Sequence, residues 1–495
     1  MKDKNLLFTR VYEQTVAEDA AREVKPVFHL APYIGWLNDP NGFSFYQGQY
    51  HLFYQYNPYS TEWDSMHWGH AVSRDFLRWT YLPAALAPDE FYDSYGCFSG
   101  SAVELPDGKQ LLLYTGARED GDGQKTIQTQ CVAIGDGRDY RKYAGNPVID
   151  GTALPEGLSR NEFRDPKIWR EPDGSLRCVA ATCDKGYLGR VLLFSSPDGL
   201  SWEFESVLME NDGRLGRMWE CPDFFPLDGK HVLLASPMDM LPEGFEYHNG
   251  NGTVCMIGRY DEETKRFLPE ADQAIDYGID FYAPQTTLTP DGRRVMIAWM
   301  QNPDTCTLSR IPERKWFGQM TLPRELSVRN GRLFQQPVRE LEQYRSGPVS
   351  YKDISIMGTV ALPGVEGRTV DMELTVRPGC NRDSYQKFAV YFAQDEQYKT
   401  SLSFRPHEST LKIDRKFSGS RRAYIHQRRC IIPHENGVLK LRIILDRFSA
   451  EVFVNDGEQV MSATISTGLA AQEISFFADG EVLMDLTKYD LFAEE

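Results

Sequence analysis

Short apolar segments of strand length, broken by Gly and Asp, recur throughout the first two thirds of the chain. One unit consists of a short motif that often contains Pro, an apolar strand, a turn around Gly and a second apolar strand. Four of the turns contain Asp-Gly, which is a strong signal for a β-hairpin. The copies start 62, 65, 56 and 62 residues apart, at Trp36, Phe98, Phe163, Trp219 and Phe281.

Further strand-like segments follow inside each unit. About four strands per unit, repeated five times, predict a five-bladed β-propeller over residues 27–338. Residues 1–26 form an N-terminal extension, and residues 339–350 are an expected linker. From 351 to 495, apolar and polar side chains alternate between Gly, Pro and Asn, which is typical of an antiparallel β-sandwich. The predicted fold class is therefore all-β: a five-bladed β-propeller followed by a C-terminal antiparallel β-sandwich.

The composition narrows the choice of partners and compartment. A chain of 495 residues is too long for one ordinary hydrophobic core, so two domains are expected. Its net charge of −17 disfavours nucleic acid and anionic membranes, which normally require clustered Lys and Arg. No segment approaches the roughly 20 apolar residues of a membrane span, and the N-terminus lacks the apolar core of a secretory signal. Nine cysteines without a CxxC pair indicate free thiols, so we expect a cytoplasmic protein.

The chemistry is expected where each repeat begins. In a propeller the first strand of every blade lines the central channel, so residues at matching places should converge there. Three of these residues are acids, although clustered carboxylates repel and raise one another's pKa. Acid/base chemistry gives a reason to keep them together. The residues at the five starts are Asp39, Ser99, Asp165, Glu220 and Tyr282.

Glycoside hydrolysis uses such a set of carboxyl groups. One carboxylate attacks the anomeric carbon, and a protonated one delivers a proton to the leaving oxygen. The short side chain of Asp39 suits the nucleophile, the longer Glu220 suits the acid/base, and Asp165 would orient the substrate. Alignment on the prolines that follow places Glu220 one position earlier than the two aspartates. Because adjacent side chains of a regular strand face opposite sides, either that strand start is irregular or Glu220 enters at a different height.

Three motifs carry a resemblance to a known family. WLNDPNG (36–42), FRDP (163–166) and WECPD (219–223), in this order and spacing, resemble the signatures of glycoside hydrolase family 32. That family comprises β-fructofuranosidases (invertases), inulinases, levanases and sucrose-6-phosphate hydrolases. The resemblance extends from Phe28 to Leu491 and implies a five-bladed propeller followed by a β-sandwich.

The resemblance also implies a mechanism and a set of site residues. The mechanism is a retaining double displacement, with Asp39 as nucleophile, Asp165 as transition-state stabiliser and Glu220 as acid/base. No metal and no cofactor are expected. Trp299 could be a further wall of the pocket or packing within a blade, and we include it among the substrate-binding residues. The residues that would hold the fructose ring are Asn38, Gln55, Trp63, Phe98, Ser99, Arg164 and Tyr282.

The predicted activity is exo-acting release of terminal β-D-fructofuranosyl units from sucrose and short fructo-oligosaccharides. Fructans and sucrose 6-phosphate stay open as substrates. A phosphate would need a pair of cations at the rim, for which Arg310, Arg314 and Lys315 are candidates. The chain departs from many relatives in having Asn161-Glu162 before FRDP, and in the segments 239–255 and 301–316. We expect these segments to be rim loops that shape the leaving-group side.

Three alternatives stay open. A fructosyltransferase would keep the fold and transfer fructosyl groups to sugars instead of water. An inverting five-bladed pentosan hydrolase would place its carboxyl groups about 6.5 to 9.5 Å apart, whereas we expect the Asp39–Glu220 separation of about 5 to 5.5 Å that implies retention. The third alternative is a non-catalytic sugar-binding propeller. The sandwich would be structural, and it could supply a homodimer contact.

Overall fold

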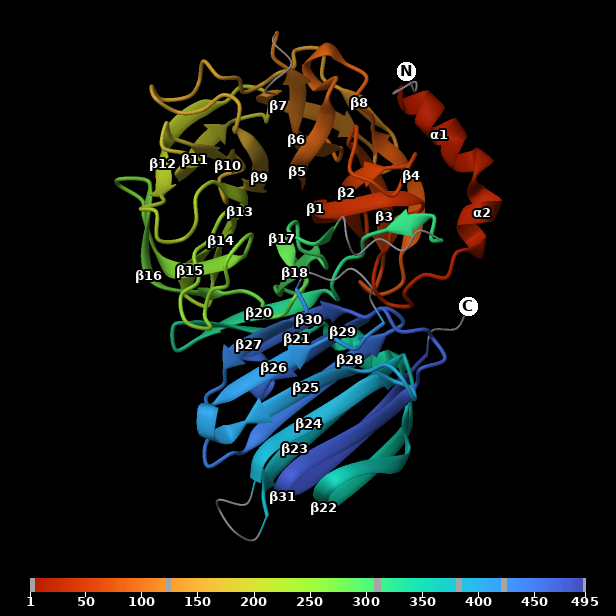
Figure 1. Ribbon diagram of the computed structural model, residues 1–495. Coiled ribbons are helices and arrows are strands. Elements are labelled where there is room, and N and C mark those ends of the chain that lie inside the picture. Colours follow the sequence, from red (N-terminus) through yellow and green to blue (C-terminus); the bar gives the residue numbers. More distant parts are fainter. Residues whose placement is uncertain (1–4, 122–125, 307–312, 380–384, 420–424, 493–495) are drawn as a thin grey trace.

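The computed structural model describes residues 5–121, 126–306, 313–379, 385–419 and 425–492. Five antiparallel sheets surround a central channel, and a separate sheet follows them in the chain (Figure 1). This is the predicted architecture, a five-bladed propeller with a C-terminal sandwich. The innermost strands of the five blades are β1 (Gly35–Tyr46), β5 (Gly96–Glu104), β9 (Arg164–Arg170), β13 (Trp219–Leu227) and β17 (Tyr282–Leu288).

Each inner strand leads outward through antiparallel neighbours, and the predicted Asp-Gly turns make the tight connections. Gly108 and Gly292 have φ of +79° and +86°, a conformation that residues with a Cβ rarely adopt. The outer strands of blades 1 and 2 are β2 (Gln49–Asn57), β3 (His67–Ser73), β4 (Thr80–Leu86), β6 (Gln110–Glu119), β7 (Thr126–Gly135) and β8 (Tyr140–Lys142). Those of blades 3 to 5 are β10 (Leu176–Cys183), β11 (Gly189–Ser196), β12 (Glu203–Glu210), β14 (Lys230–Pro237), β15 (Val254–Asp261), β16 (Arg266–Ala274), β18 (Arg294–Trp299), β20 (Arg324–Arg329) and β21 (Arg332–Pro337).

The ring is closed by a segment of blade 5 that returns to blade 1. The short strand β19 (Trp316–Phe317) lies in the chain between β18 and β20, yet it pairs in parallel with the start of β1. Trp36 of β1 stacks on Phe317, with ring centroids 4.9 Å apart. The far end of the unusual segment 301–316 therefore belongs to this closure.

The N-terminal segment covers the outer edge of blade 1. Helices α1 (Leu6–Thr15) and α2 (Ala17–Arg22) lie beside β4 (Figure 1). Arg10 donates through Nε to the carbonyl oxygen of Ala84 at 2.9 Å, and Glu13 accepts from the Ala84 N–H at 3.1 Å. These contacts shield the edge strand of the blade from pairing with another chain. Among the described residues, no helix has the length and apolar character needed to cross a membrane.

The C-terminal sheet folds into two layers because one long strand, β31 (Glu473–Leu491), belongs to both. The first half of β31 pairs with β24 and its second half with β23, while β22 (Arg345–Glu366) pairs with it along almost its whole length. Helix η3 (Arg339–Tyr344) and the start of β22 occupy the expected linker. The remaining strands are β23 (Val370–Pro378), β24 (Tyr385–Gln394), β25 (Thr400–Arg405), β26 (Thr410–Asp414), β27 (Gln427–Ile431), β28 (Leu439–Asp446), β29 (Ser449–Val454) and β30 (Gln459–Thr464). The short 3₁₀ helices are η1 (Phe91–Asp93), η4 (Pro406–Glu408) and η5 (Asn455–Gly457).

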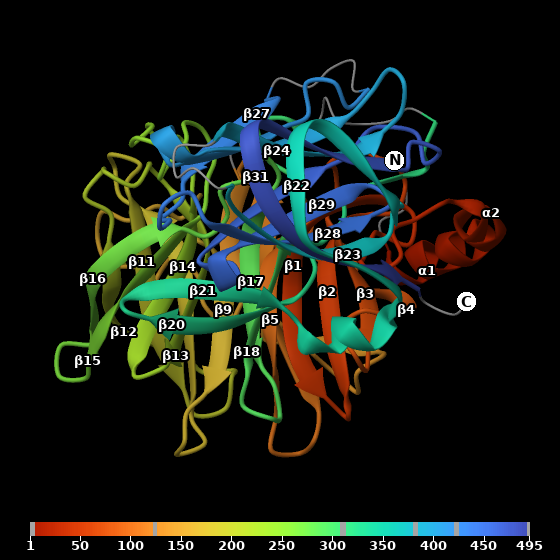
Figure 2. The ribbon, with the colours of Figure 1, turned by 90° about the horizontal axis from the view of Figure 1, so that it is seen from below.

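Strands β20 and β21 of blade 5 lie next to the sandwich (Figures 1 and 2), and a buried ionic cluster joins the two. Arg324 of β20 is fully buried and lies 2.6 Å from Glu451 of β29 and 3.0 Å from Asp276. His29 contacts the same Glu451 at 2.9 Å and Asp446 at 2.8 Å. Charges buried at this depth persist only when they are matched, so the cluster fixes how the domains meet.

Candidate active site

The starts of the five inner strands converge on one cavity of about 530 Å³. All three predicted acids line it, and so do all eight predicted substrate-binding residues. These residues come from β1, β2, β5, β9, β13, β17 and β18, and from the loop that follows β2. Their order around the ring follows the repeat that predicted them. The eleven residues are Asn38, Asp39, Gln55, Trp63, Phe98, Ser99, Arg164, Asp165, Glu220, Tyr282 and Trp299.

Irregular strand starts explain how Glu220 joins the two aspartates. The register of β13 against β14 shifts between Glu220 and Asp223, and Cys221 has φ of +49°. Asp165 has φ of +61° at the corresponding place in β9. A bulge of this kind re-aims neighbouring side chains, so the rule that adjacent residues face opposite sides does not hold here. Of the two explanations left open by the sequence, the irregular strand start is the one that the structure shows.

Asp39 is held by donors on both of its oxygens. Asn38 donates to Oδ1 at 3.1 Å, and the Ser99 hydroxyl donates to Oδ2 at 2.9 Å. The Cys221 thiol lies 3.7 Å from the same Oδ2. Burial, followed by the nearby charge of Glu220, raises the pKa of Asp39 to about 6, although the three donors oppose the shift. The group is therefore ionised near neutral pH and oriented by fixed donors.

Asp165 lies on β9 of blade 3 and is also held by hydrogen bonds. Its Oδ2 accepts the Cys221 N–H at 2.9 Å and lies 3.8 Å from Arg164 Nε. Its own N–H donates to Thr115 Oγ1 at 3.0 Å, which fixes the backbone at the bulge. Burial raises the pKa of Asp165 to about 7; Arg164 opposes this, and the charges of Glu220 and Asp39 add to it. Arg164 is thus shared by three carboxyl groups, those of Glu162, Asp165 and Glu220.

Two residues, Arg164 and Tyr282, donate hydrogen bonds to the Glu220 carboxylate. Arg164 donates to Oε1 through Nε at 3.3 Å and through a terminal nitrogen at 3.1 Å. The Tyr282 hydroxyl donates to Oε2 at 2.7 Å. The other terminal nitrogen of Arg164 donates to Glu162 at 2.5 Å. The guanidinium therefore links Glu220 to Glu162, which lies two residues before Arg164 in the chain.

Aromatic side chains form the walls of the cavity. Trp36 Nε1 donates to Asn38 Oδ1 at 2.7 Å, which orients the amide that in turn holds Asp39. Trp63 lies at the rim, 43% exposed and 6.0 Å from the Phe98 ring. Trp299 is buried 5.9 Å from Trp36, and its Nε1 has no hydrogen-bond partner within the described part of the chain. Trp299 therefore both packs in the blade and lines the pocket.

Several lining residues were not predicted from the sequence. Most of them come from loops or from β7, the third strand of blade 2, whereas Trp36 stands at the start of the first repeat. Glu162 had one visible signal, its place just before the FRDP motif. Cys221, which follows Glu220 in the chain, places its thiol 3.6 Å from Asp165 Oδ2. The additional lining residues are Trp36, Tyr95, Thr126, Gln128, Glu162, Tyr187, Met238, Pro303 and Cys306.

Two of the three candidate phosphate-binding cations, Arg314 and Lys315, lie outside the cavity. Arg314 packs over the Phe448 ring at 3.8 Å, and Lys315 pairs with Asp19 at 2.7 Å. Neither residue lines the cavity. Arg310 lies outside the described residues. His70 is buried against Phe53 and shares a hydrogen bond with His51 at 3.1 Å, in a core position.

Comparison with known proteins identifies the family. The description "Glycosyl hydrolases family 32 N-terminal domain" matches residues 29–337, and "Glycosyl hydrolases family 32 C terminal" matches residues 340–490. The chain belongs to glycosyl hydrolase family 32. It is a hydrolase of the β-fructofuranosidase type with a saccharide substrate, which confirms the predicted family, fold class and class of activity.

Relatives of this family 32 hydrolase match over almost their whole length. A sucrose-6-phosphate hydrolase of Escherichia coli is 38% identical over 470 residues, which cover 92% of this chain and 91% of the relative. A raffinose invertase of Escherichia coli is 37% identical over 472 residues, 92% of each chain. A mutant Bombyx mori GH32 beta-fructofuranosidase, solved in complex with sucrose, has a TM-score of 0.83 and 33% identity and covers 98% of each chain.

Proposed function

We propose that this family 32 hydrolase is a retaining exo-β-fructofuranosidase that removes the terminal fructosyl unit of sucrose-like sugars by double displacement. The observation that supports it most is the convergence of Asp39 and Glu220 on one cavity with different partners. Asp39 is fixed by neutral donors, whereas Glu220 is held by Arg164 and Tyr282 at the end of a longer side chain. A nucleophile must be rigid, and an acid/base must exchange protons with the leaving group and with water.

The two steps assign one role to each acid. In the first, an Asp39 oxygen bonds to the anomeric carbon of the fructosyl unit as the glycosidic C–O bond breaks. Glu220 gives its proton to the departing oxygen, and a fructosyl–Asp39 ester remains. In the second, Glu220 takes a proton from water, the water oxygen bonds to the anomeric carbon, and Asp39 leaves. Two inversions give net retention.

Asp165 and the neutral residues would bind the ring. Asp165, buried and 3.8 Å from Arg164 Nε, is suited to accept sugar hydroxyls and to stabilise positive charge on the ring as the bond breaks. Asn38, Gln55 and Ser99 offer amide and hydroxyl groups, and the aromatic walls cover the apolar ring edge.

The experiment is hydrolysis of sucrose followed by proton NMR during the first turnovers. We expect release of fructose and glucose, with β-fructofuranose as the first fructose anomer. The α-anomer would overturn the retaining mechanism and favour the inverting alternative, and an absence of fructose would favour a sugar-binding propeller. The carboxyl separation of about 5 to 5.5 Å stays a prediction of the same mechanism.

We further propose a cytoplasmic protein that does not bind nucleic acid, on the basis of the net charge of −17 and the cysteine content. A homodimer contact through the sandwich also stays a prediction. Light scattering at micromolar concentration measures the mass in solution, and cell fractionation checks the compartment.

A further inference from the structure

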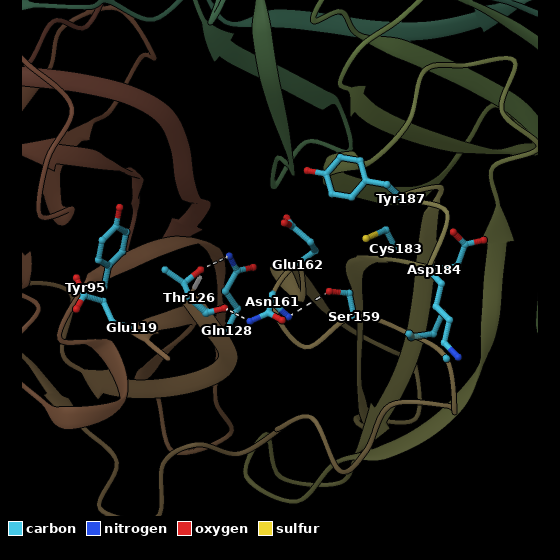
Figure 3. A pocket seen from close by; sticks show the side chains of 13 residues that line it. Tyr95, Glu119, Thr126, Gln128, Ser159, Asn161, Glu162, Cys183, Asp184 and Tyr187 are labelled. Atoms are coloured by element: carbon cyan, nitrogen blue, oxygen red, sulfur yellow. Dashed lines mark hydrogen bonds between the residues drawn. The ribbon is translucent and has the colours of Figure 1, made fainter. Parts of the chain in front are cut away.

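A second cavity of about 850 Å³ adjoins the active site between blades 2 and 3 (Figure 3). It is formed by the facing ends of β6 and β7, the loop before β9, and the loop between β10 and β11. Tyr95 and Glu119 lie on one side of it, and Cys183 and Asp184 lie on the opposite side. The residues that line both cavities are Tyr95, Thr126, Gln128, Glu162 and Tyr187. The second space is therefore continuous with the wall beside Glu220, where a leaving group would depart.

The lining of the second cavity suits sugar hydroxyls. Asn161 is fixed by donation from Nδ2 to the Thr126 carbonyl oxygen at 2.6 Å and from its N–H to Ser159 Oγ at 3.2 Å. Gln128 donates to Thr126 Oγ1 at 3.1 Å, so its amide is also oriented (Figure 3). The half-buried ring of Tyr187 offers a face at the junction with the active site. Fixed amides and hydroxyls beside aromatic rings are the groups that bind neutral saccharides.

The lining of the second cavity leaves little positive charge for an anionic group. Glu119, Glu162 and Asp184 are acids, and Lys185 is the one cation among the described residues that line it. The arginine that pairs with Asp184, Arg190, is already occupied by that carboxylate at 2.7 Å. In the first cavity the one described cation, Arg164, is occupied by Glu220 and Glu162. Phosphate groups in proteins are held by clustered Arg, Lys or backbone N–H donors. A phosphorylated leaving group would instead meet excess negative charge.

We infer that the second cavity holds a neutral sugar unit attached to the leaving group, so that the substrates are sucrose and neutral trisaccharides such as raffinose, not sucrose 6-phosphate. The inference rests on the proposed function, because it places the fructosyl unit in the first cavity. It departs from the name of one of the relatives described above, sucrose-6-phosphate hydrolase, and it depends on the acids and amides of blades 2 and 3.

The first test compares kcat/KM of the full-length enzyme for sucrose, raffinose and sucrose 6-phosphate. We expect raffinose to be within about threefold of sucrose or better, and sucrose 6-phosphate to be at least about tenfold worse, because its dianion approaches several carboxylates. A value for sucrose 6-phosphate equal to or above that for sucrose overturns the inference, and so does raffinose falling tenfold below sucrose. Failure to hydrolyse all three would instead reject the proposed function.

Two variants test the cavity directly, each judged by a ratio of substrates so that loss of folded enzyme cancels. Glu119→Arg should raise the ratio of sucrose 6-phosphate to sucrose kcat/KM about fivefold, because it removes one negative charge and adds one positive charge. Glu203→Arg makes the same change on an exposed outer strand and should leave that ratio unchanged. Ser159→Phe fills the cavity and should lower the ratio of raffinose to sucrose about tenfold. Unchanged ratios in both cavity variants reject the second cavity as a sugar site.

A variant of Lys185 tests the opposite possibility, that the second cavity binds a phosphate. If this exposed lysine holds a phosphate, Lys185→Met should selectively abolish activity on sucrose 6-phosphate, and that result would overturn the inference. We expect the ratio of sucrose 6-phosphate to sucrose to change less than twofold in this variant.

Discussion

The active-site cavity and the interface between the domains both bury carboxyl groups against arginine, but their charges are matched differently. At the interface, Glu451 accepts from Arg324, from His29 and from the Leu322 N–H. Burial would raise its pKa, yet these partners outweigh burial and lower it. In the active site, Asp39 is half-buried and Asp165 is buried, and desolvation raises their pKa values to about 6 and 7.

The difference lies in the number of cations, because the interface acids are buried at least as deeply. Arg164 pairs with three acids, Glu162, Asp165 and Glu220, and no described cation pairs with Asp39. At the interface, burial lowers the pKa of His29, but Asp446 and Glu451 outweigh it and bring the pKa to about 9. Asp276 is the exception there, since burial raises its pKa despite Arg324. A cluster in which cations balance the buried carboxylates stabilises the fold. A cluster with too few cations leaves carboxyl groups that can change protonation or attack a substrate.

The largest expected effect is a loss of activity without a loss of stability when the Asp39 carboxylate is removed. Asp39→Asn removes the nucleophile and should lower kcat on sucrose at least about 10⁴-fold, as loss of a nucleophile does in other covalent mechanisms. The same change removes an unmatched buried charge, so the melting temperature at pH 7 should stay equal or rise. Fructose release and calorimetry measure the two quantities. Full sucrose hydrolysis by the variant would contradict the assigned role.

The corresponding change at the interface should do the reverse. Glu451→Gln leaves Arg324 and His29 without their shared carboxylate and should lower the free energy of unfolding by about 3 to 5 kcal/mol. The kcat of the folded fraction should change less than about twofold, because Glu451 does not line either cavity. Urea unfolding and active-site titration check this. A loss of kcat without loss of stability would remove the distinction between the clusters.

The positions of the three acids are predictable from the sequence, whereas residues that lie outside the repeat are not. The repeat places Asp39, Asp165 and Glu220 at strand starts, and the order of blades around a ring then brings them together. Residues outside the repeat, such as Gln128 on the third strand of blade 2 and Tyr187 in a loop, carry no such signal, because these segments reach the cavity through their own conformations. The interface cluster also cannot be predicted from the sequence pattern. Arg324 and Glu451 are 127 residues apart and look like ordinary surface charges in the sequence.

The pH dependence of stability should distinguish the clusters by sign. The pKa of Asp39 is about 6 in the native state and about 3.9 when unfolded, so the native state binds more protons between these values. The free energy of unfolding contributed by this group therefore falls as pH rises through that window, by on the order of 2 to 3 kcal/mol. Glu451 and Asp446, whose pKa values are lowered, contribute stability above the unfolded value and lose it only as pH falls through the native value.

Melting curves of wild type and Asp39→Asn from pH 4 to pH 8 measure this difference. The variant should gain nothing over wild type near pH 4, and its advantage should grow to a plateau above pH 7. A difference that is constant with pH would mean that the Asp39 charge is matched after all.

The smallest expected effect concerns Cys221, whose thiol lies 3.7 Å from Asp39 Oδ2 and 3.6 Å from Asp165 Oδ2. A hydroxyl is a stronger donor than a thiol, so Cys221→Ser should stabilise the carboxylate form. The acid limb of kcat/KM should then move to lower pH by about half a unit, while Cys221→Ala, which removes the donor, should move it to higher pH. The pair is matched in size, and the opposite signs separate donation from packing. Shifts in the same direction in both variants would show that the thiol acts by filling space. The raised pKa values of the active-site aspartates would then come only from burial and from the neighbouring carboxylates.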